Sequence, residues 1–433
     1  MNCTRRLRWF LMVCALLASA TVVEAQHEFV GPYNSGVEAL KQNRLDEAVA
    51  LFTRAVDLDP KDHLAYNNRG VAYKKKGLFD KAIEDYNRAL DVKPDYPFAL
   101  VNRGLARYEK GDLDGALQDL TEATGPRKLP RDGAVRTSLA VVKRAKGDLD
   151  GALKELRLAI TFNKSYTRAY QVLGEILEEQ RDYRGALDAY DRVYRLSKRD
   201  EDTDRLIKKI EGLRLEYARV LHAKGLDEFR QGDVKRALAS WSEAIKVDPK
   251  CVQALRDRGL VQHKVGKFAA AAEDFASALA IVPDNGELHR VRADAYFKMK
   301  KLDQALDDYD KAIALDPKDA VAYNNRAMIY HQRNELDTAL KDYSRAISLS
   351  PGDATFLENR GLLLTAKGDL RQALKDFSLA LKACKDPDRR ASIEKRIETL
   401  SSHTQAQRGN PLPPLPEVSD TTDPTRAASG AER

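Results

Sequence analysis

The phrase "AYNNRG" occupies residues 65–70, and "AYNNRA" returns at residues 322–327. Both copies fall at the same place in a longer pattern, which an alanine marks along the chain. These alanines are Ala48, Ala82, Ala116, Ala152, Ala186, Ala237, Ala271, Ala305, Ala339 and Ala373. They are 34 residues apart, except for one step of 36 and one of 51. A fixed period of this length predicts an array of repeated units, not a few unrelated domains.

Each period contains the pattern of two helices. A large apolar residue follows each marker alanine by four positions, and these residues are Phe52, Tyr86, Leu120, Leu156, Tyr190, Trp241, Phe275, Tyr309, Tyr343 and Phe377. This spacing places both on one face of a second helix. A small residue stands twelve positions before each alanine, so a first helix can pack closely against the second. Most turns between them carry glycine or asparagine, which accept a left-handed backbone, whereas Arg181 and Lys300 predict less regular turns.

The 34-residue helix-turn-helix pattern resembles the tetratricopeptide repeat, with ten copies over residues 29–386. The resemblance implies an all-α fold, a right-handed superhelical solenoid of helix-turn-helix repeats. The first helices of this family line the inner groove of the superhelix, and some relatives hold peptides there with a ladder of asparagines.

The chain is expected to divide into six segments. Residues 1–25 read as a cleaved signal peptide, because three arginines precede an apolar run too short for a membrane helix. Residues 29–200 hold repeats 1–5, and residues 218–386 hold repeats 6–10. Between them, residues 201–217 form an inserted helix or a long extension of the next one. Residues 387–401 read as a polar capping helix and residues 402–433 as a disordered proline-rich tail. The leader predicts export, to a bacterial periplasm or cell envelope, with no stable membrane span.

Composition excludes several functions. The formal net charge of +7 is mild for 433 residues, and aromatic residues make up only 7% of the chain. With no dense basic tract, nucleic acid is not an expected partner. Cysteine and histidine spacings match no metal site, no phosphate-binding loop or catalytic triad emerges, and we expect neither a cofactor nor an enzyme. Cys251 and Cys384 are expected to be buried free thiols.

The asparagines are the sharpest clue to function. The second asparagine of the phrase recurs at one position of the first helix, as Asn34, Asn68, Asn102, Asn325 and Asn359. An amide offers a donor and an acceptor, so such a column can bind the main chain of an extended peptide. Neighbouring groove positions carry Asn67, Asn324, Arg256, Arg290, His263 and His331. The alternative is that these asparagines, and the arginines that follow them, solvate the helix and bond neighbouring repeats.

These observations predict a non-catalytic exported scaffold whose groove binds extended segments of partner proteins. The alternative is an accessory subunit of a cell-envelope enzyme or assembly complex, which would act through its outer helix faces and residues 201–217. The sequence leaves the partner and the oligomeric state open. The tail contains "RGNPLPPLP" at residues 408–416, which resembles a polyproline ligand, although a stiff spacer is the simpler interpretation.

Overall fold

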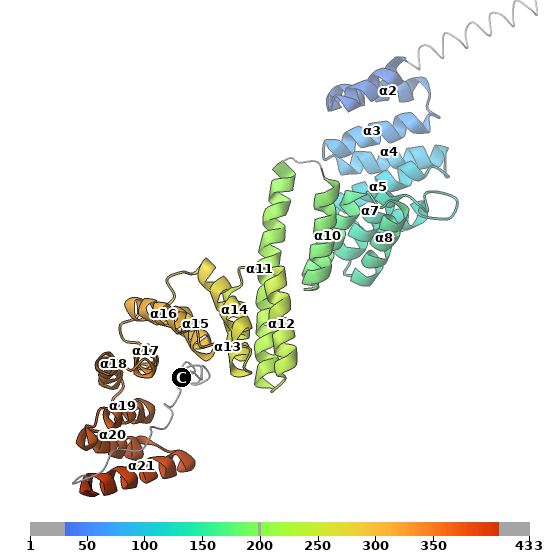
Figure 1. Cartoon of the computed structure of the whole chain (residues 1–433). Helices are drawn as coiled ribbons and strands as arrows, with labels where there is room; N and C mark the ends of the chain where they lie inside the picture. Colours follow the sequence, from blue (N-terminus) through green and yellow to red (C-terminus); the bar gives the residue numbers. More distant parts are fainter. Residues whose placement is uncertain (1–30, 198–200, 407–433) are drawn as a thin grey trace, which may run out of the picture. The chain divides into compact units, whose positions relative to one another are not determined.

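The computed structural model describes residues 31–197 and 201–406, and within these ranges the regular structure is entirely α-helical (Figure 1). The predicted signal peptide and most of the predicted tail lie outside the described residues. The chain divides into two compact units, Met1–Leu213 and Arg214–Arg433. The expected all-α array of helix-turn-helix repeats is confirmed, with ten successive helix pairs in the described part of the chain.

Unit 1 contains repeats 1–5. Its helices are residues 31–41, α2 (Leu45–Leu58), α3 (His63–Lys75), α4 (Phe79–Val92), α5 (Pro97–Lys110), α6 (Leu113–Ala123), α7 (Gly133–Ala145), α8 (Leu149–Phe162), α9 (Thr167–Glu179), α10 (Tyr183–Leu196) and the first part of α11 (Glu201–Arg230). Consecutive helices pack as pairs, such as α3 with α4 and α9 with α10, and each pair packs on the next.

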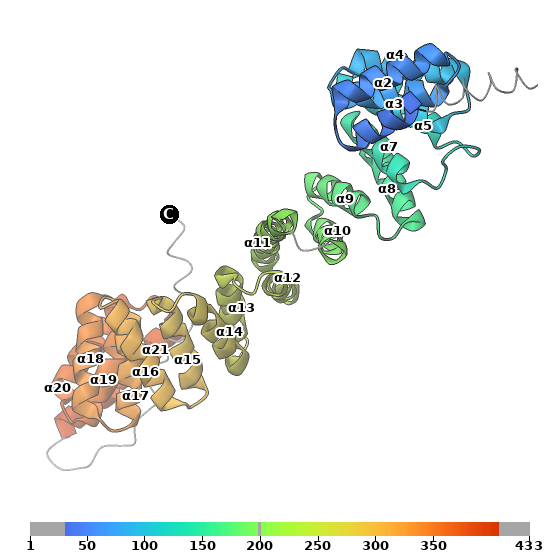
Figure 2. The ribbon, with the colours of Figure 1, turned by 90° about the horizontal axis from the view of Figure 1, so that it is seen from above.

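Unit 2 contains repeats 6–10 and a final helix. It begins with the second part of α11 and continues through α12 (Val234–Val247), α13 (Val252–Lys264), α14 (Phe268–Ile281), α15 (Gly286–Lys298), α16 (Leu302–Leu315), α17 (Ala320–Gln332), α18 (Leu336–Leu349), α19 (Ala354–Ala366), α20 (Leu370–Ala383) and α21 (Pro387–Ala406). Figure 2 shows the helices of this unit as successive neighbouring pairs. No helix in residues 31–197 or 201–406 is both long and apolar enough to cross a membrane.

The repeated apolar positions form the core in the register that the sequence predicts. All ten marker alanines have no exposed surface, and the large residues that follow them are at most 1% exposed. The small residues of the first helices are required by this packing. A Cβ atom added to Gly225 would lie 2.4 Å from Nε1 of Trp241, and one added to Gly174 would lie 2.7 Å from the Tyr190 ring. The aromatic ring therefore fills the space that a side chain would take.

The turns inside the repeats are more uniform than the sequence suggests. Arg181 and Lys300 both have φ of 59°, in the same left-handed region as Asn43 and the six turn glycines. The expectation of irregular turns at these two positions is wrong, because the backbone imposes the left-handed conformation whichever residue stands there. For a residue with a Cβ atom, this left-handed conformation costs about 1–2 kcal/mol of conformational free energy.

Replacing Lys300 with glycine is therefore expected to stabilise unit 2 by about 0.5–1 kcal/mol, after the entropy that glycine loses on folding is subtracted. The side chain of Lys300 is exposed, so little packing is lost. Chemical denaturation of Lys300→Gly beside Lys318→Gly, an exposed lysine outside the left-handed region, measures the difference. Equal destabilisation of both variants would contradict the expected relief of strain.

The inserted residues 201–217 are the first part of α11, which continues without a break to Arg230. They lengthen the first helix of repeat 6. Lys209 lies in this extension and joins it to repeat 5, since its ammonium group is 3.0 Å from a carboxylate oxygen of Glu178 on α9. The segment predicted as an inserted helix is thus helical and continuous with the next repeat.

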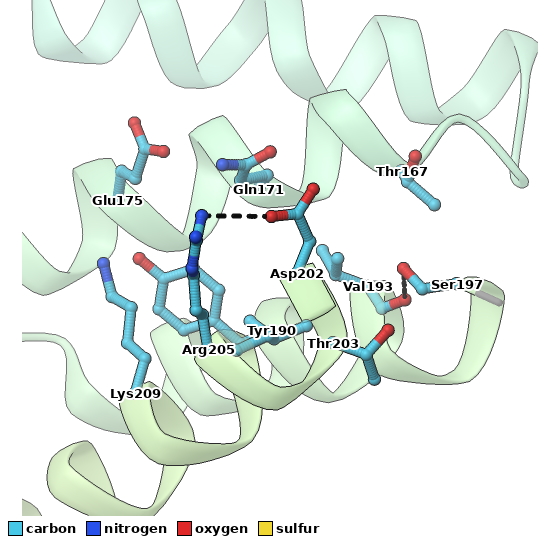
Figure 3. A pocket seen from close by; sticks show the side chains of 11 residues that line it. Thr167, Gln171, Glu175, Tyr190, Val193, Ser197, Asp202, Thr203, Arg205 and Lys209 are labelled. Carbon is cyan, nitrogen blue, oxygen red and sulfur yellow. Dashed lines mark hydrogen bonds and ion pairs between the residues drawn. The ribbon is translucent and has the colours of Figure 1, made fainter. Parts of the chain in front are cut away.

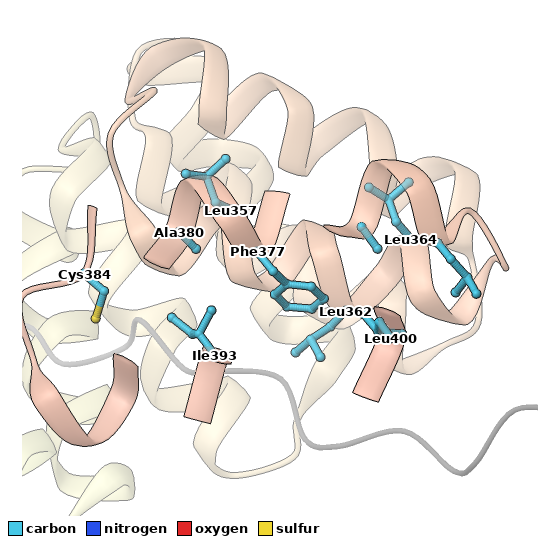
Figure 4. Close-up of a cluster of buried hydrophobic side chains, with 10 residues drawn as sticks. Leu357, Leu362, Leu364, Phe377, Ala380, Cys384, Ile393 and Leu400 are labelled. Carbon is cyan, nitrogen blue, oxygen red and sulfur yellow. The ribbon is translucent and has the colours of Figure 1, made fainter. Parts of the chain in front are cut away.

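Helix α21 covers the end of the array. Ile393 and Leu400 are buried against Phe377 of α20, in the apolar cluster drawn in Figure 4. Arg389 donates two hydrogen bonds to one carboxylate oxygen of Glu358 on α19, at 2.9 and 2.8 Å. The helix predicted over residues 387–401 therefore lies within α21, which packs on the last repeat. Cys251 and Cys384 are buried and free, as expected.

Candidate functional site

The first asparagine pair belongs to a chain of side-chain hydrogen bonds that joins repeats 1, 2 and 3. Asn102 on α5 donates to Oδ1 of Asn67 on α3 at 3.0 Å. Asn67 donates to Oδ1 of its neighbour Asn68 at 3.2 Å. Asn68 in turn donates to the hydroxyl oxygen of Tyr33 in the first repeat at 3.0 Å. Each residue of the pair thus faces a different neighbouring repeat.

The second pair repeats this arrangement across repeats 8, 9 and 10. Asn359 on α19 donates to Asn324 on α17 at 3.0 Å, and Asn324 donates to Asn325 at 2.9 Å. Asn325 then donates to Oδ1 of Asp294 on α15 at 3.0 Å. The same oxygen accepts a 2.6 Å hydrogen bond from the hydroxyl group of Tyr309.

These bonds explain why two adjacent asparagines recur. The first asparagine accepts a hydrogen bond from a side chain of the next repeat, and the second donates one to a side chain of the previous repeat. Because the two asparagines also bond to each other, the pair links three consecutive repeats. His222 and Asp257 take the same two positions in repeats 6 and 7, with a 2.7 Å contact between Nε2 and Oδ2. We call the contacts Tyr33–Asn68, Asn67–Asn102, His222–Asp257 and Asn324–Asn359 the inter-repeat ladder. Peptide contact by the asparagines stays a prediction.

The recurring asparagines and their asparagine neighbours are buried in unit 2 and more exposed in unit 1. Asn324 and Asn359 have no exposed surface and Asn325 is 1% exposed. Asn68 and Asn102 are half-buried, Asn67 is buried and Asn34 is exposed. A peptide in the groove therefore has direct access to the amides of unit 1, whereas those of unit 2 lie beneath other side chains.

The cationic candidates in unit 2 are also engaged with the protein. Arg256 contacts Asp257 at 3.0 Å. Arg290 is 8% exposed and contacts Asp319 at 3.0 Å, with Asp294 at 3.7 Å. Burial raises the pKa of Asp294, while Arg290 and the hydrogen bonds from Tyr309 and Asn325 oppose that rise. The ion pairs and hydrogen bonds among these side chains thus stabilise the buried charges of Arg290 and Asp294.

The two histidine candidates lie at the same position of different repeats and do not meet. His263 is buried, with its ring 5.1 Å from the ring of Phe268. His331 is half-buried, with its ring 6.5 Å from that of Tyr343, and burial lowers the pKa of His331. In the described part of the chain, no group of three or more His, Cys, Asp and Glu residues is placed to hold a metal ion.

Six arginines that follow the asparagine position each clamp an aspartate of their own repeat. Nε and Nη2 of the arginine donate to the two carboxylate oxygens at 2.6–2.9 Å. The pairs are Arg69–Asp85, Arg103–Asp119, Arg258–Asp274, Arg292–Asp308, Arg326–Asp342 and Arg360–Asp376. Such two-pronged pairs are strong and fix geometry. In five of them Nη1 also reaches the second helix of the preceding repeat.

Sequence reasoning assigned the arginines to solvation or to inter-repeat bonds and missed their aspartate partners. The signal was present, because an aspartate stands three residues after the marker alanine in each of these six repeats. It was overlooked because the two partners are 16 residues apart and face each other only when the two helices are paired.

Unit 1 also exposes apolar side chains beside its asparagines. Leu64 and Phe98 occupy equivalent positions on α3 and α5 and are 38% and 54% exposed. Each stands four residues before a half-buried asparagine, so the apolar residue and the amide share one helix face. Next to them, the ring of Tyr96 lies 4.8 Å from that of His63 and 5.7 Å from that of Phe98. We call His63, Leu64, Tyr96 and Phe98 the aromatic patch.

A cleft of about 480 Å³ opens where the extension of α11 lies beside α9 and α10 (Figure 3). Gln171 and Glu175 line it from α9, and Arg205, Leu206 and Lys209 line it from α11. Its inner wall includes Tyr190, whose ring centroid is 4.8 Å from the ammonium group of Lys209. The step of 51 residues between marker alanines was the sequence signal for the long α11, whose first part forms one wall of this cleft.

The helix pairs, their register and their buried columns define a helix-turn-helix repeat protein. Models of the tetratricopeptide repeat match residues 63–96 and 320–353, 38–77 and 293–332, 101–167, 169–204, and 228–295. Together these matches cover more than half of the chain, which therefore belongs to the tetratricopeptide repeat proteins. Proteins of this class typically bind other proteins along extended concave surfaces. No curated protein sequence matches the chain significantly.

Several solved structures resemble the chain. Yeast Tom70 is 15% identical, with 88% of this chain and 97% of Tom70 covered and a TM-score of 0.39. PilF of Pseudomonas aeruginosa is 17% identical, with 53% and 96% covered and a TM-score of 0.39. MamA is 27% identical, with 37% and 93% covered and a TM-score of 0.35.

Proposed function

We propose that this protein is a non-catalytic, exported scaffold that binds extended segments of partner proteins along the first helices of its repeats. The face of α3 and α5 in unit 1 is the main binding surface. The observation that supports this most directly is the pairing of half-buried Asn68 and Asn102 with exposed Leu64 and Phe98 on that face. Export is proposed from the arginine-led apolar leader at residues 1–25.

The amides of Asn68 and Asn102 retain bonding capacity beyond the ladder. An asparagine side chain has two N–H donors and one carbonyl oxygen. The ladder bonds of each amide use one N–H, which leaves the second to bond a peptide carbonyl oxygen. Exposed apolar residues on the same face would contact alternate side chains of the peptide, so main-chain and side-chain recognition act together.

Replacing Asn34, Asn68 and Asn102 with alanine is expected to weaken partner binding by about 0.5–1.5 kcal/mol for each neutral hydrogen bond lost. The measurement is affinity capture from envelope extract with residues 26–433, followed by mass spectrometry and titration of the partners identified. The control replaces Asn87 with alanine, an exposed asparagine of the second helix α4 that lies off the proposed binding face and accepts a hydrogen bond from Arg103. Circular dichroism must show that both variants remain folded.

Partners that bind the wild type and the Asn87→Ala control but not the triple variant would support partner binding by the groove asparagines. Partners retained equally by all three proteins would contradict it. In that case the accessory-subunit alternative becomes the better proposal, and the cleft between α9, α10 and α11 is the surface that favours it. Loss of those partners from Arg205→Glu, an exposed position in the cleft, would then identify the binding surface.

A further inference from the structure

The aromatic patch has the geometry of a site for a polyproline segment. Leu64 and Phe98 stand on the first helices of consecutive repeats, and α3 and α5 are in contact. Helices packed in this way have axes about 8–10 Å apart. The patch therefore offers exposed apolar side chains at that spacing, with the Tyr96 ring between His63 and Phe98.

The chain itself carries a segment with the matching period. Residues 411–416 read "PLPPLP", and proline favours the polyproline II conformation, which has three residues per turn and rises about 3.1 Å per residue. In that conformation Leu412 and Leu415 lie on one face, about 9 Å apart. This distance falls within the range of about 8–10 Å typical of packed helices, so one leucine can contact each repeat.

Polar groups at the edges of the patch complement the segment. A polyproline helix makes no internal hydrogen bonds, so its carbonyl oxygens require outside donors, and Asn68 and Asn102 lie one helical turn from Leu64 and Phe98. Lys93 is exposed and stacks on the Tyr96 ring at 5.7 Å. Glu417 directly follows the last proline of the segment and has the opposite charge.

We propose that the aromatic patch binds residues 409–416 of a second copy of this chain. Two residues separate the end of α21 at Ala406 from Gly409, so three Cα-to-Cα steps give the segment a reach of about 10 Å from that helix. Binding within one chain would require repeats 1–3 to lie within that distance of α21, whereas a second copy needs no such arrangement. The contact joins the tail of one copy to the first repeats of another. It uses the face of α3 and α5 that is also proposed to bind partner segments, so the tail would compete with those segments for the same surface.

The test is sedimentation velocity of purified residues 26–433 over two decades of concentration. The mass of the wild type is expected to rise with concentration. Phe98→Ala, and separately Leu412→Ala with Leu415→Ala, should each weaken self-association at least about tenfold, as truncation of a central aromatic or apolar anchor does. Phe162→Ala is the matched control, because Phe162 is a 40% exposed aromatic residue outside the patch.

A mixture of the two deficient variants provides the decisive measurement. One retains an intact tail and the other an intact patch, so together they should form a one-to-one complex that neither forms alone. Self-association that is unchanged in both variants, or absent from the wild type at every concentration, would overturn the proposal. A monomeric wild type that binds a synthetic peptide of residues 407–418 only after its own tail is altered would show an intramolecular contact, which also overturns binding between copies.

Discussion

Replacing Asp308 with alanine is expected to lower the free energy of unfolding of unit 2 by about 3–5 kcal/mol. Asp308 is 2% exposed and accepts from Nε and Nη2 of Arg292, both at 2.7 Å. Nδ1 of His289 contacts the same carboxylate at 2.9 Å. The variant removes the shared acceptor and leaves a largely buried guanidinium group without its partner. That uncompensated charge is the main source of the expected loss.

Asp303→Ala is the control for this prediction. Asp303 also forms an ion pair on α16, with Arg333, but 90% of its side chain is exposed. Exposed pairs contribute little, since water and salt screen them. Guanidinium unfolding gives the overall change, and hydrogen exchange of the α15 and α16 amides shows whether the loss begins there. An Asp308 variant as stable as the Asp303 variant would show that the arginine clamp does not hold the repeat together.

The core could be predicted from the sequence because its signals are local and repeated. An alanine and an aromatic residue four positions apart define one face of one helix, and ten copies of the pair fix the register. The turns at Arg181 and Lys300 were harder to predict, because their left-handed backbone is imposed by the two helices and not by the residue. For residues 201–217 the sequence predicts either a separate helix or an extension of the next one, because both have the same helical pattern.

The candidate site was harder to predict from the sequence, because its hydrogen bonds join residues of different repeats. Sequence reasoning placed Asn68, Asn102, Asn325 and Asn359 at one position of the first helix, which the structure confirms. It could not rank their exposure, which depends on what the adjacent repeats contribute. In unit 2, Asn325 bonds to Asp294, and Tyr309 shares that acceptor, so the amide lies inside a polar network. In unit 1, Asn68 bonds to the half-buried Tyr33 and remains partly open.

Replacing Asn324 with alanine is the second prediction with a large expected effect, a loss of about 2–4 kcal/mol in the stability of unit 2. Asn324 has no exposed surface, accepts from Asn359 and donates to Asn325. The variant breaks both bonds in a buried setting, where polar groups that lose a partner cost about 1–3 kcal/mol each. Denaturant unfolding beside Asn34→Ala, an exposed asparagine on the first helix of repeat 1, compares the loss of a buried amide with the loss of an exposed one.

The outcome separates the two roles of the asparagines, because a residue that only binds a peptide can be removed without loss of stability. If Asn324→Ala unfolds as readily as expected while Asn34→Ala does not, the amides of unit 2 serve the inter-repeat ladder. The peptide-binding proposal then rests on unit 1, where the ladder leaves amides accessible. If both variants are as stable as the wild type, the ladder contributes little to stability, although Asn325 and Asn359 stay buried and the exposed or half-buried Asn34, Asn68 and Asn102 remain the candidates for partner binding.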